Sequence, residues 1–191
     1  MQMSSDREAK KRGAATVGGD AVAKEITLMS VPDGEKRTTE ATGRERRATV
    51  RALSDWSRHS GDSLPSFTEM RDTFDDADAW RDRFLLKRDA IPARSVFIMC
   101  GDAVRAWTAI PPVSRTLDEV VPAGVRETVC ALCEAAARTS EPQSADDSYH
   151  EPSGAEIMYR CIFLPMRGAE SELDYIMGAF SAKRTMDMPA P

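Results

Sequence analysis

The stretch YRCIFLPMRGAESELDYIMGAF, residues 159–180, decides the fold, because it consists of two apolar runs joined by a short polar turn. The runs extend to residues 155–165 and 173–183, and both have the composition and length of β-strands. Neither run carries an obvious acid, base or nucleophile. The sequence therefore predicts that the chain closes on a buried antiparallel hairpin.

Side chains of a strand alternate between the two faces of a sheet. In the first strand of the hairpin, one face receives Tyr159, Cys161 and Phe163, and the other receives Met158, Arg160, Ile162 and Leu164. The pattern does not decide which of the two sets faces the helices of the protein.

The elements before this hairpin can be ordered from their apolar periods. A helix is predicted over residues 45–60, then a loop broken by Pro65 and a short helix with Asp78 as its N-cap. Two extended runs, 83–89 and 95–101, predict a first hairpin. Short helices follow, then one long helix over 123–139, and DDSYHE (146–151) is a candidate for a further strand.

Length and composition suit one compact domain with flanking segments. The chain has 191 residues, a net charge of −5 and 41% hydrophobic residues. We divide it into a disordered tail (1–43), an N-terminal helix (44–62), a main domain (63–185) and a short tail (186–191). The first tail has no aromatic residue and no sustained apolar period, so it cannot offset the entropy of ordering.

The same patterns indicate a location and exclude some partners. No apolar stretch approaches the roughly 20 residues of a membrane helix, and the N-terminus lacks the apolar region of a signal peptide. The four cysteines lie in apolar stretches, which favours reduced thiols. We therefore expect a cytoplasmic protein without a membrane or nucleic-acid partner, since it has no clustered basic face.

Several short motifs, taken in order, resemble those of one sensory family. These are LSDWSRHSGDSLPS (53–66), FIMCGDAV (97–104) followed by a Pro-Pro pair and TLDEVVP (116–122), YRCIFLP (159–165) and DYIMGAF (174–180). The order and spacing resemble the alphaproteobacterial single-domain PAS family, over about residues 45–184. The resemblance implies an α+β fold, with a five-stranded antiparallel sheet, helices over one face and a preceding N-terminal helix.

In PAS domains the space between the long helix and the last strands holds a ligand or is filled by side chains. The candidate pocket residues are Leu132, Cys133 and Ala136 of the long helix with Tyr159, Arg160, Cys161 and Phe163 of the hairpin. Arg160 is a candidate clamp for an acidic ligand, the alternative being a solvated surface arginine. An ordinary filled core is the alternative for the others.

Cofactor and enzyme chemistry find little support in the sequence. Cys130 and Cys133 form a CxxC pair, but it lies inside a helix and has no second pair to complete a zinc site. Residues 123–139 lack the histidine that haem-binding PAS domains commonly use, and the cysteine motif of flavin-photochemical PAS domains is absent. We predict no metal, haem or flavin, and no enzyme activity.

The functional prediction is a stand-alone PAS-type sensory or regulatory module that acts through protein contacts, alone or with a small-molecule ligand. The alternative is a small-molecule-binding protein or minor enzyme with a pocket between the long helix and the sheet. Val50, Leu53 and Trp56 are predicted to form a homodimer interface, or else to dock on the chain's own sheet. A separate signalling protein is a further candidate partner.

Overall fold

The structure is a computed structural model that describes residues 45–74, 77–108, 110–168 and 173–185. In chain order its elements are α1 (Glu45–His59), η1 (Arg71–Thr73), α2 (Ala77–Trp80), β1 (Arg83–Lys87), η2 (Pro92–Arg94), β2 (Val96–Cys100), α3 (Asp102–Trp107), α4 (Leu117–Val120), α5 (Ala123–Thr139), β3 (Gln143–His150), β4 (Glu156–Arg167) and β5 (Leu173–Arg184).

The strands form one five-stranded antiparallel sheet in the order β2-β1-β5-β4-β3. The two longest strands, β4 and β5, lie side by side and form the closing hairpin that the sequence predicted. The strand β5 also pairs with β1, so β5 is the central strand of the sheet, and β1, the first strand among the described residues, lies next to it. The predicted α+β class with a five-stranded antiparallel sheet is confirmed.

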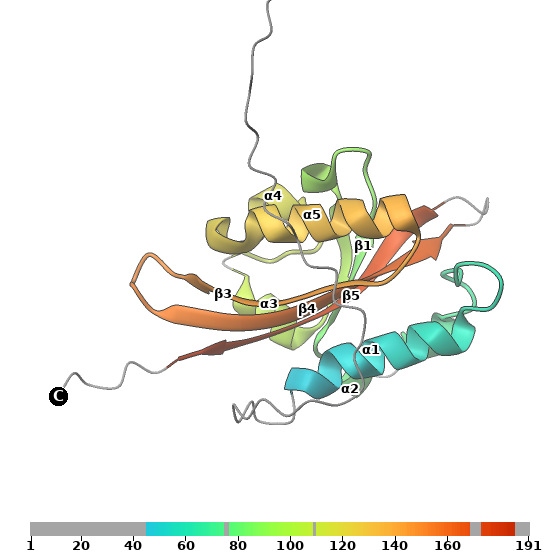
Figure 1. Cartoon of the computed structure of the whole chain (residues 1–191), viewed down its shortest axis with the longest axis horizontal. Helices are drawn as coiled ribbons and strands as arrows, with labels where there is room; N and C mark the ends of the chain where they lie inside the picture. Colours follow the sequence, from blue (N-terminus) through green and yellow to red (C-terminus); the bar gives the residue numbers. More distant parts are fainter. Residues whose placement is uncertain (1–44, 75–76, 109, 169–172, 186–191) are drawn as a thin grey trace, which may run out of the picture. The chain divides into compact units, whose positions relative to one another are not determined.

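Helices cover both faces of this sheet (Figure 1). The long helix α5 runs along one face, which we call the inner face, and α1 runs along the opposite, outer face. Alternation along β4 sends Cys161 and Phe163 to the core under α5, and Ile162 and Leu164 to the core under α1. Both faces of the hairpin are therefore buried, which explains why its sequence is apolar almost without interruption.

The long helix α5 follows from its apolar stripe. Its buried residues recur at helical spacing along one side of the helix: Val125, Val129, Leu132, Cys133 and Ala136. The helix ends at Ser140, which adopts a left-handed conformation with φ 59° and donates its backbone N–H to the Ala136 carbonyl. This helix lies where the sequence placed it.

Two sequence-based boundaries were wrong. Strand β3 begins at Gln143, three residues before the predicted DDSYHE segment. Its start was not recognised because β3 is an edge strand, and polar residues occupy its exposed side. Asp78 lies inside the first turn of α2 and is not its N-cap. The predicted tails, residues 1–43 and 186–191, lie outside the described residues.

Candidate functional site

The inner face brings most of the predicted pocket residues together. One buried cluster beneath α5 contains Leu132, Cys133, Ala136, Tyr159, Cys161 and Phe163. The structure thus settles the alternation of the hairpin, because Tyr159, Cys161 and Phe163 face α5 on the inner face, whereas Ile162 and Leu164 face α1. Ligand binding by these residues stays a prediction.

Aromatic rings occupy the space between this hairpin and the helices. Trp107 stacks on Phe180 with 3.7 Å between ring centroids, and its Nε1 donates a hydrogen bond of 2.9 Å to the hydroxyl of Tyr149. Tyr149 in turn lies 6.1 Å from the ring of Tyr159. These contacts correspond to the filled-core alternative for the inner face.

Arg160 does not belong to this group, and its assignment to the inner pocket was wrong. Its neighbours along β4 point to the helices, so alternation places Arg160 on the outer face. There its guanidinium forms an ion pair with Asp146, the residue opposite it on β3. Arg160 therefore acts as a cross-strand partner near the edge of the sheet.

The buried thiols are poorly suited to nucleophilic or redox chemistry. Burial raises the pKa of Cys133 to about 11 and that of Cys161 to about 12. Burial also raises the pKa of Cys130, the other member of the CxxC pair. Near neutral pH these side chains are protonated, whereas the thiolate is the reactive species.

The outer face is organised around Trp56 of α1. Its side chain is 8% exposed and packs into a second core cluster with residues of β1, β4 and β5. The indole Nε1 donates a hydrogen bond of 2.7 Å to the carbonyl of Pro165. Pro165 lies beyond Phe163, where the pairing of β4 with β3 ends. The sheet therefore tolerates a proline there and has a carbonyl available for Trp56.

The three apolar residues of α1 that were predicted to form one interface do not lie on a single exposed surface. Trp56 is buried against the chain's own sheet, Leu53 packs at the border of the same cluster, and Val50 is 55% exposed. The side of α1 that meets the sheet is instead marked by Ala52 and Trp56, spaced four residues apart. The docking alternative holds for Trp56, whereas the oligomeric state stays a prediction.

The loop after α1 is fixed to the same end of β4. Arg167 donates its backbone N–H to the Pro65 carbonyl at 3.1 Å and its Nε to the Leu64 carbonyl at 2.7 Å. Its guanidinium also pairs with Glu69 at 2.9 Å. Two motifs that the sequence analysis treated separately, the Trp-helix with its Pro loop and the Leu-Pro strand, therefore form a single contact region.

A buried ion pair on the outer face was missed by the sequence analysis. Arg83, at the start of β1, is 1% exposed, and its Nη2 lies 2.5 Å from the Asp55 carboxylate of α1. A second arginine, Arg58, approaches the same carboxylate at 3.4 Å. The available signal was a charged residue directly before the apolar run of β1, but the sequence does not reveal its partner in α1.

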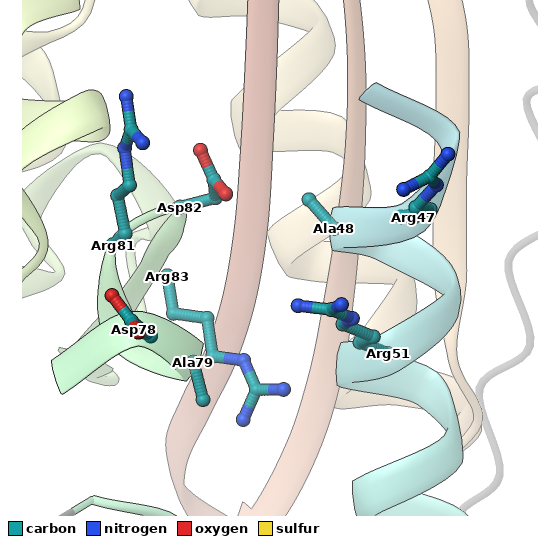
Figure 2. Close-up of a pocket in the computed structure, with 8 residues that line it drawn as sticks. All are labelled: Arg47, Ala48, Arg51, Asp78, Ala79, Arg81, Asp82 and Arg83. Atoms are coloured by element: carbon teal, nitrogen blue, oxygen red, sulfur yellow. The ribbon is translucent and has the colours of Figure 1, made fainter. Parts of the chain in front are cut away.

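Two cavities stand out among the described residues, and neither is lined by Tyr159, Cys161 or Phe163. The larger, of about 470 Å³, lies between α1 and the α2–β1 segment (Figure 2) and is lined by Arg47, Ala48, Arg51, Asp78, Ala79, Arg81, Asp82 and Arg83. The smaller, of about 200 Å³, lies beside η2 and α5 and is lined by Arg88, Asp89, Ala90, Pro92, Cys133, Glu134, Ala137 and Arg138.

The described residues also lack two kinds of feature. Within them, no group of three or more His, Cys, Asp or Glu side chains is placed to hold a metal ion. None of the helices in the described ranges has both the length and the apolar character to cross a bilayer.

Comparison with known proteins finds no match in sequence and only distant similarities of structure. No family model matches the chain, and no curated protein matches it in sequence. Among solved structures it is similar to a light-oxygen-voltage domain (TM-score 0.43, 10% identity, 63% of this chain and 87% of that chain). It is also similar to the PAS domain of the fruit-fly ELK potassium channel (TM-score 0.43, 11% identity, 61% and 96%). A PAS domain from Colwellia psychrerythraea gives a TM-score of 0.40 at 8% identity (59% and 95%).

Proposed function

We propose that this chain is a PAS-type sensory or regulatory module that acts through protein contacts in the cytoplasm. Membership of the alphaproteobacterial single-domain PAS family is part of the same proposal. The observation that carries it is the double burial of the closing hairpin. Its inner side chains contact the core under α5, and its outer side chains contact α1.

This arrangement gives α1 the position of an output element. Cys161 and Ile162 are consecutive residues of β4, yet one packs against the helices of the inner face and the other belongs to the cluster that contains Trp56. A displacement of β4 caused by a change on the inner face would therefore also displace α1, because closely packed cores transmit displacements. The outward side of α1 presents Val50 to a partner.

The state of the cysteines supports a location and a role without thiol chemistry. The four cysteines are free thiols, as is usual in a reducing compartment. Burial raises the pKa of Cys100 to about 11, as it does for Cys133. A binding role therefore agrees better with these side chains than a role in covalent catalysis.

Photo-crosslinking from α1 tests the proposal. A photoreactive amino acid is introduced at Val50 in the full chain expressed in its own cell, with the same substitution at Ile91, which is 48% exposed in the β1–β2 connection, as the control. We expect a discrete protein adduct from position 50 and none from position 91. Absence of an adduct from position 50, with a second copy or any other protein, would overturn the proposal.

The partner of α1 can be a second copy of this chain, and light scattering tests for such a homodimer. Light scattering across a concentration series should show a dimer for the wild type and a monomer for Val50→Glu, with an unchanged melting temperature because Val50 is exposed. Ile91→Glu should remain dimeric. A wild type that stays monomeric at high concentration contradicts the homodimer and leaves a separate protein as the partner.

A further inference from the structure

The larger cavity on the outer face has an unusual lining. Four arginines and two aspartates surround it, together with two alanines. Figure 2 shows Arg47 and Arg51 extending from α1, and Arg83 from the start of β1, on opposite sides of the space, while Arg81 and Asp78 lie on the side remote from α1. Positive side chains thus approach the cavity from two separate elements.

The two arginines of α1 that line the cavity, Arg47 and Arg51, have no carboxylate partner within the described part of the chain. No ion pair joins Arg47 or Arg51 to a described acidic residue, whereas Arg58, on the same helix, pairs with Asp55. The cavity is also lined by two carboxylates, Asp78, which has an interaction of its own, and Asp82. The lining therefore carries an excess of positive charge.

One arginine that lines the cavity carries a buried donor that has no acceptor among the described residues. Arg83 lines the cavity although it is 1% exposed. Its Nη2 is held by Asp55 at 2.5 Å, but its Nη1 is buried and has no hydrogen-bond partner among the described residues. A buried donor left unsatisfied is costly, and more so when it belongs to a charged group. An anionic oxygen in the cavity would remove that cost.

We propose that this cavity binds a small organic phosphate, with Arg47 and Arg51 from α1 and Arg83 from β1 as its ligands. The planar forks of arginine match the oxygens of a phosphoryl group, and charge-assisted hydrogen bonds of this kind are strong. The volume of about 470 Å³ falls within the range of roughly 300–1,000 Å³ that is typical of small-molecule sites. Asp82 offers an acceptor to a hydroxyl or amino group on the remainder of the ligand.

The inference goes beyond the proposed function and does not depend on it. The site lies on the outer face, whereas the ligand pocket predicted from the sequence lies in the core of the inner face. A phosphate held between α1 and β1 would join two elements that already meet through Asp55 and Arg83. Binding to the folded state alone would stabilise the protein by mass action.

Inorganic pyrophosphate is a suitable probe, titrated against the full chain at ionic strength held constant with sodium chloride. We expect a saturable rise in melting temperature, confirmed by calorimetric titration. Arg51→Gln and Arg47→Gln should each weaken binding by about tenfold or more, because each removes a charge-assisted hydrogen bond. These residues are exposed, so the variants should keep the far-UV circular dichroism of the wild type.

Arg94→Gln is the matched control, because Arg94 is an exposed arginine of η2 outside this cavity. Its affinity for pyrophosphate should stay within twofold of the wild type. Absence of saturable binding, equal affinity in Arg51→Gln and wild type, or an equal loss in Arg94→Gln would each overturn the proposal. Citrate in a parallel titration separates phosphate from carboxylate recognition, and tighter binding of citrate would overturn the assignment to phosphate.

Discussion

Trp56 donates its indole N–H to the carbonyl of Pro165 across a separation of 109 residues, at 2.7 Å and within a buried cluster. This hydrogen bond joins the first helix to the last hairpin. Trp56→Phe keeps an aromatic ring but removes the donor, so that the Pro165 carbonyl loses its partner. We expect the free energy of unfolding to fall by about 1–3 kcal/mol, measured by urea denaturation.

The control for this prediction lies on the same helix. Val50 is 55% exposed, and Val50→Ala should change the free energy of unfolding by less than about 0.5 kcal/mol. A Trp56→Phe variant as stable as Val50→Ala would contradict the role assigned to the hydrogen bond.

A second prediction concerns Gly178, which faces the ring of Phe84 across the β1–β5 pair. A Cβ atom at Gly178 would lie 2.1 Å from Cζ of Phe84, and that ring is held by Phe163 at 5.4 Å and Phe97 at 5.8 Å. Gly178→Ala should therefore destabilise the protein by about 1–3 kcal/mol through overpacking. Thermal and urea denaturation measure the change.

A smaller residue at position 84 should relieve the clash. The double variant Gly178→Ala with Phe84→Leu should lose less stability than the sum of the two single variants, because contacting residues are not additive. Gly61→Ala, where nothing lies within 4 Å of an added Cβ, serves as the neutral control. Strict additivity of the two changes would show that the clash is not the cause.

Elements could be predicted from the sequence where the local pattern of apolar residues reflects their burial. Features that depend on contacts with residues far away in the chain could not be predicted. The hairpin of β4 and β5 was predictable because both of its faces are buried, so apolar composition alone marks it. The docking side of α1 was misassigned because Ala52 is small and does not stand out as part of an apolar stripe. The polar β3 was shortened because an edge strand needs few apolar residues.

The outer cavity could not be predicted for a related reason. Two of its arginines come from α1, and the other two, Arg81 and Arg83, follow at least thirty residues later in the chain. In the sequence each of them looks like an ordinary solvated charge. Only the packing of α1 on the outer face places Arg51 near Arg83. The same packing pairs Nη2 of Arg83 with Asp55 and leaves its Nη1 without a partner among the described residues.

A third prediction follows from the pair between Asp55 and Arg83. The side chain of Arg83 is 2% exposed and that of Asp55 is 20% exposed, so Asp55→Asn would leave a buried guanidinium without its counter-ion. We expect a loss of about 3 kcal/mol in the free energy of unfolding, because removing one partner of a buried pair strands the other charge.

Asp118→Asn provides the comparison for this pair. Asp118 pairs with Arg126 at 3.1 Å, but the side chain of Asp118 is 63% exposed and that of Arg126 is 37% exposed, so neither is buried. Exposed pairs contribute about 0–1 kcal/mol, so this variant should be nearly neutral. Equal losses in Asp55→Asn and Asp118→Asn would show that burial of Arg83 does not govern the effect.

A fourth prediction concerns alkaline pH. Burial raises the pKa of Cys161 to about 12 in the folded chain, whereas an unfolded cysteine ionises near 8.5. Below pH 8 both states are protonated and the thiol adds no pH dependence. As pH rises through about 9 the unfolded state loses the proton first, so the folded state becomes less stable by up to about 1.4 kcal/mol per pH unit for this thiol.

Urea denaturation at pH 8, 9, 10 and 10.5 measures this slope in the wild type and in Cys161→Ala. The variant begins at a lower stability because it leaves a small cavity, but its stability should fall less steeply above pH 9, since one of the buried thiols no longer ionises on unfolding. Cys130→Ala is the control, because Cys130 is only partly buried and its removal should change the slope less. If the slope of Cys161→Ala equals that of the wild type, burial of the Cys161 thiol is not the source of the alkaline loss of stability.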